Sequence, residues 1–428
     1  MSGSLVADLG IGPETWLFLS FLGCVTLYFK FSRVWSVRNL DLLLLFVIAP
    51  GLMSLVGHGG KGIQQPWISF VLLFAGSACW LIRCVVDLGL VRRPLLEPNL
   101  NAAGLACLLV ALLGLLIAET VSLTVGEGVN RNPAKAGSAL EGAQSGSTAG
   151  EATVKEVLKH APLPGTLKSN PPRVILSRVL ASLAHVLMVC ALIATGWWHF
   201  NRPITGLAMA TCYLIMPYTR IALVDSGQLV PAALVVTAVA FYNRPALAGG
   251  LIGVASGWMP ACLGLIPLWA GFYRGRGTVR FLALAIPVIV VCGGLGWYFP
   301  ELSAFARDLG ARSLTEAGLV PHAEPPASGS FWTGLDVSYR LPVIIAYISL
   351  VLITTIWPTE KNLGELVALS AAQLVASQFW YLADGGTLVL LYLPLVLLMM
   401  FRPNLAAKRA LILEPRARVK REPALPVR

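Results

Sequence analysis

Long apolar runs recur through almost the whole of this 428-residue chain, and they restrict the class of fold that it can adopt. A helix needs roughly 20 apolar residues to cross about 30 Å of bilayer hydrocarbon. Runs close to that length occur at 14–29, 40–57, 66–86, 101–124, 174–198, 203–217, 228–242, 280–298, 341–357, 363–380 and 386–401. The chain is therefore predicted to be an all-α, polytopic transmembrane helix bundle.

The composition supports a membrane protein and argues against several other classes. Apolar residues make up 56% of the chain and charged residues only 12%, so there is more hydrocarbon than a soluble surface can hide. The net charge of +11 does not indicate nucleic acid, because the basic residues mark the ends of apolar runs and do not interleave with aromatics in one patch. The eight cysteines all lie within apolar segments, without a CxxC or zinc spacing. We expect a lipid bilayer as partner, no nucleic acid, no metal and no cofactor.

One apolar segment, 245–273, is too long for a single span and is interrupted in its middle by Gly257-Trp258-Met259-Pro260. Proline lacks the amide that continues a helical hydrogen-bond ladder, so a hinge is expected there. Two short helices in a broken hairpin bring the prediction to about 11–13 membrane segments, by the length rule. The hairpin also returns both Arg274 and the basic tail to the cytoplasm, where basic loops stay.

This orientation places the N-terminus outside and the C-terminus inside, with the chain as a multi-pass protein of the plasma (inner) membrane. The predicted organisation has N-terminal transmembrane helices (1–124), a flexible extracytoplasmic loop (125–173), a central transmembrane region (174–298), a second extracytoplasmic loop (299–340), C-terminal transmembrane helices (341–401) and a basic cytoplasmic tail (402–428). The first loop is rich in Gly, Ala and Ser, as flexible linkers are.

Ionisable side chains deep in a bilayer are costly and tend to be functional. Here, those in the predicted spans lie near span ends, where a snorkelling or paired charge is the simpler interpretation. They include Asp41, Arg83, Asp87, Glu119 and Glu365. Arg83 and Asp87 are four residues apart, and we expect them to form an ion pair on one helix. His185 has no second histidine at a metal-ligand spacing and is interpreted as a hydrogen-bonded core residue.

A polar group interrupts the hydrocarbon at YTRIALVDSGQLVPAALVV, which begins at Tyr218. On the predicted topology its polar residues are extracytoplasmic and can share one membrane-surface cleft with residues from two other span ends. The candidates are Tyr218, Arg220, Asp225, Gln228, Trp258, Trp380 and Asp384. An arginine suits a lipid phosphate, an aspartate can act as a general base, and aromatic faces suit a sugar ring or prenyl chain. The alternative is an ordinary polar turn with a surface pair between Arg220 and Asp225.

The stretch from Gly227 to Phe281 resembles the central region of GT-C-type, polyprenyl-phosphate-sugar-dependent membrane glycosyltransferases, particularly glycosyltransferase family 87. The matching motifs are Gly227-Gln228, Asn243-Arg244-Pro245, Ala248-Gly249, Met259-Pro260 and the basic exit Arg274 to Arg280. The resemblance covers about 60 residues of 428. Two features depart from the family pattern: Met259 replaces a lysine that would meet a lipid phosphate, and the first extracytoplasmic loop, His58 to Pro66, has no acid.

The resemblance implies a GT-C-like fold that transfers a hexose from a polyprenyl-phosphate donor to an acceptor hydroxyl at the outer face, in an active or a degenerate form. For this reaction we expect Asp225 to act as base, Arg220 to meet the phosphate, and Gln228 and Trp258 to contact the sugar. A second hypothesis is a non-catalytic membrane protein that binds lipid or partner proteins, which both departures favour. A third is a transporter, since broken helices can mark substrate sites, although the spans show no internal repeat.

Overall fold

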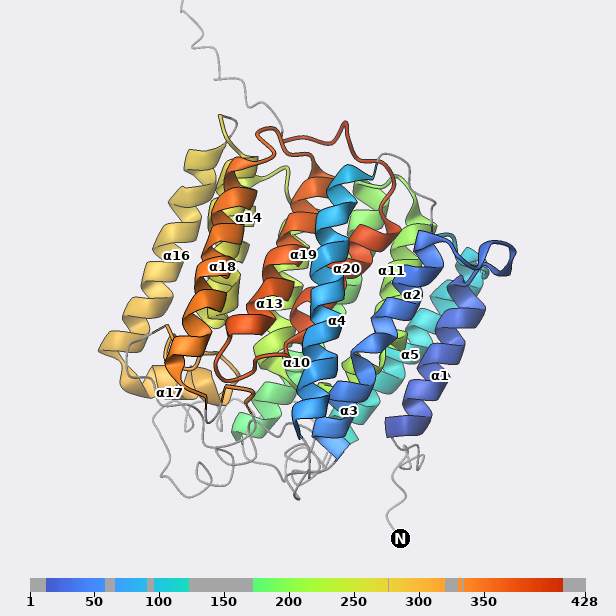
Figure 1. The fold of residues 1–428 in the computed structure, drawn as a ribbon, viewed down its shortest axis with the longest axis horizontal. Coiled ribbons are helices and arrows are strands. Elements are labelled where there is room, and N and C mark those ends of the chain that lie inside the picture. Colours follow the sequence, from blue (N-terminus) through green and yellow to red (C-terminus); the bar gives the residue numbers. More distant parts are fainter. Residues whose placement is uncertain are drawn as a thin grey trace, which may run out of the picture.

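The structure is a computed structural model that describes residues 13–57, 66–90, 96–122, 172–275, 277–319, 330–332 and 335–410. Every regular element in these ranges is a helix, which confirms the all-α prediction. The helices lie side by side in one bundle (Figure 1). The first predicted loop, 125–173, lies almost entirely outside the described residues, as do 58–65 and 411–428.

The N-terminal helices are α1 (Pro13–Tyr28), η1 (Phe31–Arg33), α2 (Val37–Val47), α3 (Ala49–Gly57), α4 (Pro66–Val86), η2 (Asp87–Gly89) and α5 (Ala102–Ser122). The central helices are α10 (Pro172–Trp198), α11 (Pro203–Ile215), α12 (Pro217–Ile221), α13 (Ser226–Ala240), α14 (Pro245–Trp258), η4 (Pro260–Gly264), α15 (Leu265–Phe272), α16 (Thr278–Tyr298) and α17 (Pro300–Asp308). The C-terminal helices are α18 (Val337–Ile356), α19 (Leu363–Trp380) and α20 (Val389–Phe401).

Helix length and surface chemistry indicate a polytopic helical membrane protein. Among the described residues, five helical segments are long and apolar enough to cross a bilayer, and shorter apolar helices pack between them. The five are Val37–Leu55, Trp67–Gly89, Ala102–Val121, Pro172–Trp198 and Val337–Ile356. Large apolar side chains also point outward: Val110 on α5, Val290 on α16 and Ile353 on α18 are 69%, 64% and 58% exposed. An outer surface of this kind suits contact with lipid.

The bundle has two ends, and most of the polar chemistry lies at them. We call the end at which α10, α13 and α20 begin end A, and the end at which they finish end B. End A is at the bottom of Figure 1, where α17 lies across the ends of its neighbours. End B carries the η1 turn and the segment that follows α20.

The interrupted segment forms the predicted broken hairpin. Helix α14 ends at Trp258, Met259 has extended backbone, and η4 and α15 then continue the chain. The Tyr273 hydroxyl, just after α15, donates a 2.6 Å hydrogen bond to the carbonyl of Tyr242, just before α14. Both ends of the segment therefore return to end B, and the hinge points to end A.

Small residues allow α14 and α16 to pack unusually closely. A methyl group added at Gly249 would lie 2.2 Å from the Phe281 carbonyl oxygen, and one at Gly253 would lie 3.0 Å from that of Ala285. Only glycine fits such a close approach of two backbones. Gly249 and Gly253 therefore set the distance between α14 and α16.

The charges at end B form one buried network across three parts of the bundle. The Arg83 guanidinium contacts Asp41 at 2.6 Å and Asp87 at 3.0 Å, and Arg402 also donates to Asp87. Asp87 is fully buried. The expected pair of Arg83 and Asp87 is confirmed, and the network ties α2, α4 and the start of the tail together.

His185 is a hydrogen-bonded core residue, as predicted. It is fully buried on α10, where Nδ1 lies 2.8 Å from the Tyr213 hydroxyl and Nε2 lies 3.2 Å from the Leu223 carbonyl oxygen. Because a carbonyl only accepts, Nε2 carries the proton and Nδ1 accepts from Tyr213. His185 thus holds the turn that leads from α12 into α13.

Candidate functional site

Four segments that are far apart in the sequence bring a set of polar side chains together at end A. We call this set the acid–arginine cluster: Asp225, Gln228, Trp258, Arg312 and Asp384. Asp225 and Gln228 come from the start of α13 and Trp258 from the end of α14. Arg312 follows α17, and Asp384 lies in the turn between α19 and α20.

Asp225 is positioned by the start of α13, for which it is the N-cap. Its carboxylate accepts hydrogen bonds from the Gly227 amide at 3.1 Å and from Gln228 Nε2 at 3.0 Å. Only 2% of Asp225 is exposed. Gln228 in turn accepts a 3.1 Å hydrogen bond from the Leu390 amide, so it links the start of α13 to the start of α20. The first backbone amides of a helix have no acceptor within the helix, and the side-chain oxygen of a capping residue accepts a hydrogen bond from one of them.

Arg312 supplies the positive charge at the centre of the cluster. Its backbone amide donates to the Trp258 carbonyl at 2.8 Å, and Nη2 lies 2.9 Å from Asp384 Oδ2. Burial by itself would lower the pKa of Arg312, but the charges of Asp384 and then Asp225 outweigh it and raise that pKa above its ordinary value. The guanidinium is therefore held charged between two carboxylates.

Several buried N–H donors around the turn between α19 and α20 have no acceptor among the residues that the structure describes. They are Arg312 Nε, Trp332 Nε1, Gln378 Nε2 and Trp380 Nε1. Their segments meet at this turn, because Gln378 accepts from the Leu388 amide and Arg312 pairs with Asp384. Buried donors are normally satisfied, so this region suits a molecule rich in oxygen acceptors.

An apolar groove of about 440 Å³ adjoins the cluster. It is lined by Phe74, Phe331, Trp332, Pro342, Val343, Ala346 and Phe379, which come from α4, α18, α19 and the segment before α18. A methyl group on Gly385 would lie 3.6 Å from the Trp332 ring. Gly385 follows Asp384 in the chain, so the Trp332 side of the groove lies close to the backbone of Asp384. An apolar chain in the groove could thus have its polar end near Asp384.

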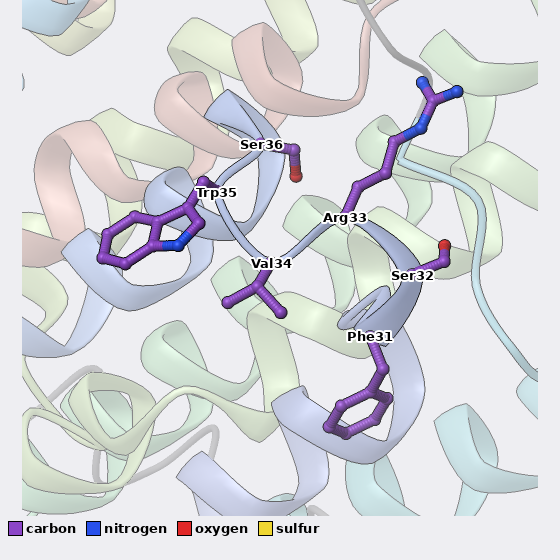
Figure 2. Close-up of a pocket in the computed structure, with 6 residues that line it drawn as sticks. All are labelled: Phe31, Ser32, Arg33, Val34, Trp35 and Ser36. Carbon is purple, nitrogen blue, oxygen red and sulfur yellow. The ribbon is translucent and has the colours of Figure 1, made fainter.

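A second hollow, of about 650 Å³, lies at end B and is formed by Phe31 to Ser36. Figure 2 shows the Phe31, Arg33 and Trp35 side chains pointing away from one another. Trp35 is 88% exposed. This is an open turn at the surface, and it does not assemble a chemical site.

Three predicted site residues lie outside the cluster. The buried Tyr218 hydroxyl donates to the Leu45 carbonyl. Arg220 pairs with Glu119 and lies 4.2 Å from the centre of the Trp16 ring, so the surface pair of Arg220 with Asp225 that the alternative required is not formed. Trp380 is buried and its ring centre lies 5.2 Å from that of Tyr347.

Arg312 is the member of the cluster that sequence reasoning missed. Its only signal was its position in the second predicted loop, 299–340. The described part of that loop does pack on the bundle, because Arg312 contacts Asp384 and Ser330 Oγ donates to the Leu382 carbonyl. The sequence does not show which residue an arginine in a loop will pair with, because the partner can be distant in the chain.

No family model, no curated protein and no solved structure matches this chain. Among the described residues, no three His, Cys, Asp or Glu side chains gather as the ligands of a metal ion do. The candidate site therefore stands on its own geometry.

Proposed function

We propose that the protein is an integral membrane glycosyltransferase of GT-C-like fold, with about 11–13 membrane segments, that moves a sugar from a polyprenyl-phosphate donor to an acceptor hydroxyl. The observation that carries the proposal is the acid–arginine cluster. A buried carboxylate, Asp225, and a guanidinium on a side chain that is only 11% exposed, Arg312, lie together at one end of an apolar bundle. Charged groups placed this way are expensive and tend to mark functional sites.

In the proposed reaction, Asp225 accepts the proton of the acceptor hydroxyl. The hydroxyl oxygen then forms a bond to the anomeric carbon from the face opposite the phosphate. The bond between that carbon and the phosphate oxygen breaks, and the phosphate leaves with the electron pair, which inverts the configuration. Arg312 stabilises the departing phosphate, the role that the sequence alone had predicted for Arg220.

The groove supports the lipid half of the substrate. Its lining is apolar, and it adjoins Asp384, so a prenyl chain in the groove would place its phosphate toward Arg312. In this proposal end A faces the extracytoplasmic side, because Lys30, Arg202 and Arg402 gather at end B and basic ends stay in the cytoplasm. The membrane would be the plasma membrane.

A specific observation favours the second function, a non-catalytic protein that binds lipid or partner proteins. Both hydrogen bonds of the Asp225 carboxylate, to Gly227 and Gln228, are those of an ordinary helix cap. A carboxylate in this role can stabilise a fold without taking part in chemistry. The same cluster and groove would then hold a lipid headgroup and its chain without turnover.

The test is transfer of radiolabelled sugar from a polyprenyl-phosphate donor by the full chain in lipid nanodiscs. Asp225→Asn keeps the size and a hydrogen-bond acceptor but removes the base, and should slow transfer by about 10²–10⁴-fold. Asp336→Asn is a matched control, since Asp336 is an exposed cap that accepts from the Ser338 amide at the start of α18. Wild-type rates in Asp225→Asn would remove the proposed base. Lipid binding without transfer from any sugar-phosphate donor would favour the non-catalytic function.

A further inference from the structure

Arg178 on α10 is a buried arginine that has no partner in the part of the chain that the structure describes. Only 4% of it is exposed, and Nη1 has no hydrogen-bond acceptor. It makes no hydrogen bond or ion pair with any residue that the structure describes. Two equally buried arginines differ in this respect: Arg402 pairs with Asp87, and Arg340 donates to the carbonyls of Trp380, Gly318 and Ala317.

An uncompensated charge in such a place is strongly unfavourable. A guanidinium cannot lose its proton at any ordinary pH, so it cannot escape the penalty by becoming neutral. Removing the only counter-charge of a buried ion is among the most destabilising changes known in proteins. A buried arginine without a carboxylate or carbonyl therefore indicates that an anion completes its environment.

The position of Arg178 is near the candidate site. Arg178 and His185 are seven residues apart, and both are on the buried face of α10. His185 contacts the Leu223 carbonyl, two residues before Asp225. At the start of α10, Arg173 pairs with Asp308 at 2.6 Å, where α17 ends. Arg178 thus lies on α10 between the contact with α17 and the contact with the turn that carries Asp225.

We propose that Arg178 binds a phosphate-type anion at end A. Phosphate presents several oxygens to the planar fork of N–H donors, which is the geometry that arginine recognises best. The charge of the anion replaces the missing carboxylate. The same chemistry is offered by a lipid headgroup or by a free phosphate, and the choice of phosphate over other anions rests on the proposed function.

The experiment uses the full chain in a maltoside detergent, which carries no phosphate, and follows the thermal unfolding midpoint against ligand concentration. The probes are inorganic phosphate, diphosphate and, in separate micelles, a polyprenyl phosphate. A ligand that binds the folded state raises the midpoint, and the titration yields a dissociation constant. A rise with the soluble anions identifies a free phosphate group, and a rise only with the lipid identifies a headgroup.

Arg178→Met removes the charge while keeping an unbranched apolar chain. It should weaken binding by roughly tenfold or more, and, because it deletes an unpaired charge, the ligand-free midpoint should equal or exceed that of the wild type. Arg178→Lys keeps the charge without the fork and should give intermediate binding. Arg173→Met, on the same helix but paired with Asp308, is the matched control and should bind like the wild type.

The proposal is overturned if no probe raises the wild-type midpoint, or if Arg178→Met shows the same rise. A much lower ligand-free midpoint in Arg178→Met also contradicts it, since that result would mean a structural partner within the protein. Failure of the proposed enzyme is a separate result. Binding that depends on Arg178 without any sugar transfer would sustain the anion site and reject the glycosyltransferase.

Discussion

Replacing Arg312 by methionine should destabilise the folded protein strongly. The Arg312 side chain is 11% exposed and that of Asp384 is 5% exposed, so the pair is almost fully desolvated. Without the guanidinium, Asp225 and Asp384 would remain buried near each other with the same charge. Breaking a buried pair from one side costs about 3–5 kcal/mol, because the remaining charge is left uncompensated.

The companion variant Asp384→Asn should cost less, since Arg312 keeps the charge of Asp225 nearby. The double variant should therefore be less destabilised than the sum of the two single variants, with a coupling of about 0.5–3 kcal/mol. Free energies of unfolding can be measured by denaturant titration in bicelles. Arg409→Met is the control: Arg409 and Glu360 form an ion pair with side chains 49% and 63% exposed. That pair should contribute at most about 1 kcal/mol.

The reasoning is refuted if Arg312→Met and Arg409→Met change the free energy of unfolding equally. Strictly additive single variants would also refute it, because they would mean that Arg312 and Asp384 do not interact. Either result would remove the electrostatic basis of the acid–arginine cluster.

Two further predictions concern the scaffold that holds the cluster. Gly249→Ala should push α14 away from α16 at the Phe281 carbonyl and lower the free energy of unfolding by about 1–3 kcal/mol. Gly250→Ala is the control: its added methyl group meets nothing within 4 Å, so it should be neutral or slightly stabilising. Equal unfolding midpoints for the two variants would contradict the close packing. His185→Phe leaves the buried Tyr213 hydroxyl and Leu223 carbonyl without their partner and should cost about 1–3 kcal/mol. An unfolding midpoint at the wild-type value would show that His185 does not hold the turn before Asp225.

Patterns that are local in the chain were sufficient to predict much of the architecture. Apolar runs of membrane length indicated the helices, and Pro260 indicated the break in the segment 245–273, because a missing amide acts on its own helix. The pair of Arg83 and Asp87 followed from a spacing of four residues. Gly249, Gly253 and Gly257 recur at every fourth residue, a spacing that by itself favours close packing of one helix face on another.

The composition of the candidate site depended on contacts that no local pattern contains. The sequence placed Asp225, Gln228, Trp258 and Asp384 at the same face of the membrane, and the fold adds Arg312 from the second predicted loop. It directs Arg220 to Glu119 instead, about a hundred residues earlier in the chain.

The architecture could be predicted from the sequence and the partners of the charged residues could not, for a physical reason. Helix formation and span length depend on neighbours within a few residues. A buried ion is stable only with a counter-charge, and that partner can come from any segment that packs against it. The sequence alone therefore determined that this chain forms a helical bundle for a membrane. Only the tertiary structure decided that Asp384 pairs with Arg312, that Arg220 pairs with Glu119, and that Arg178 has no partner among the described residues.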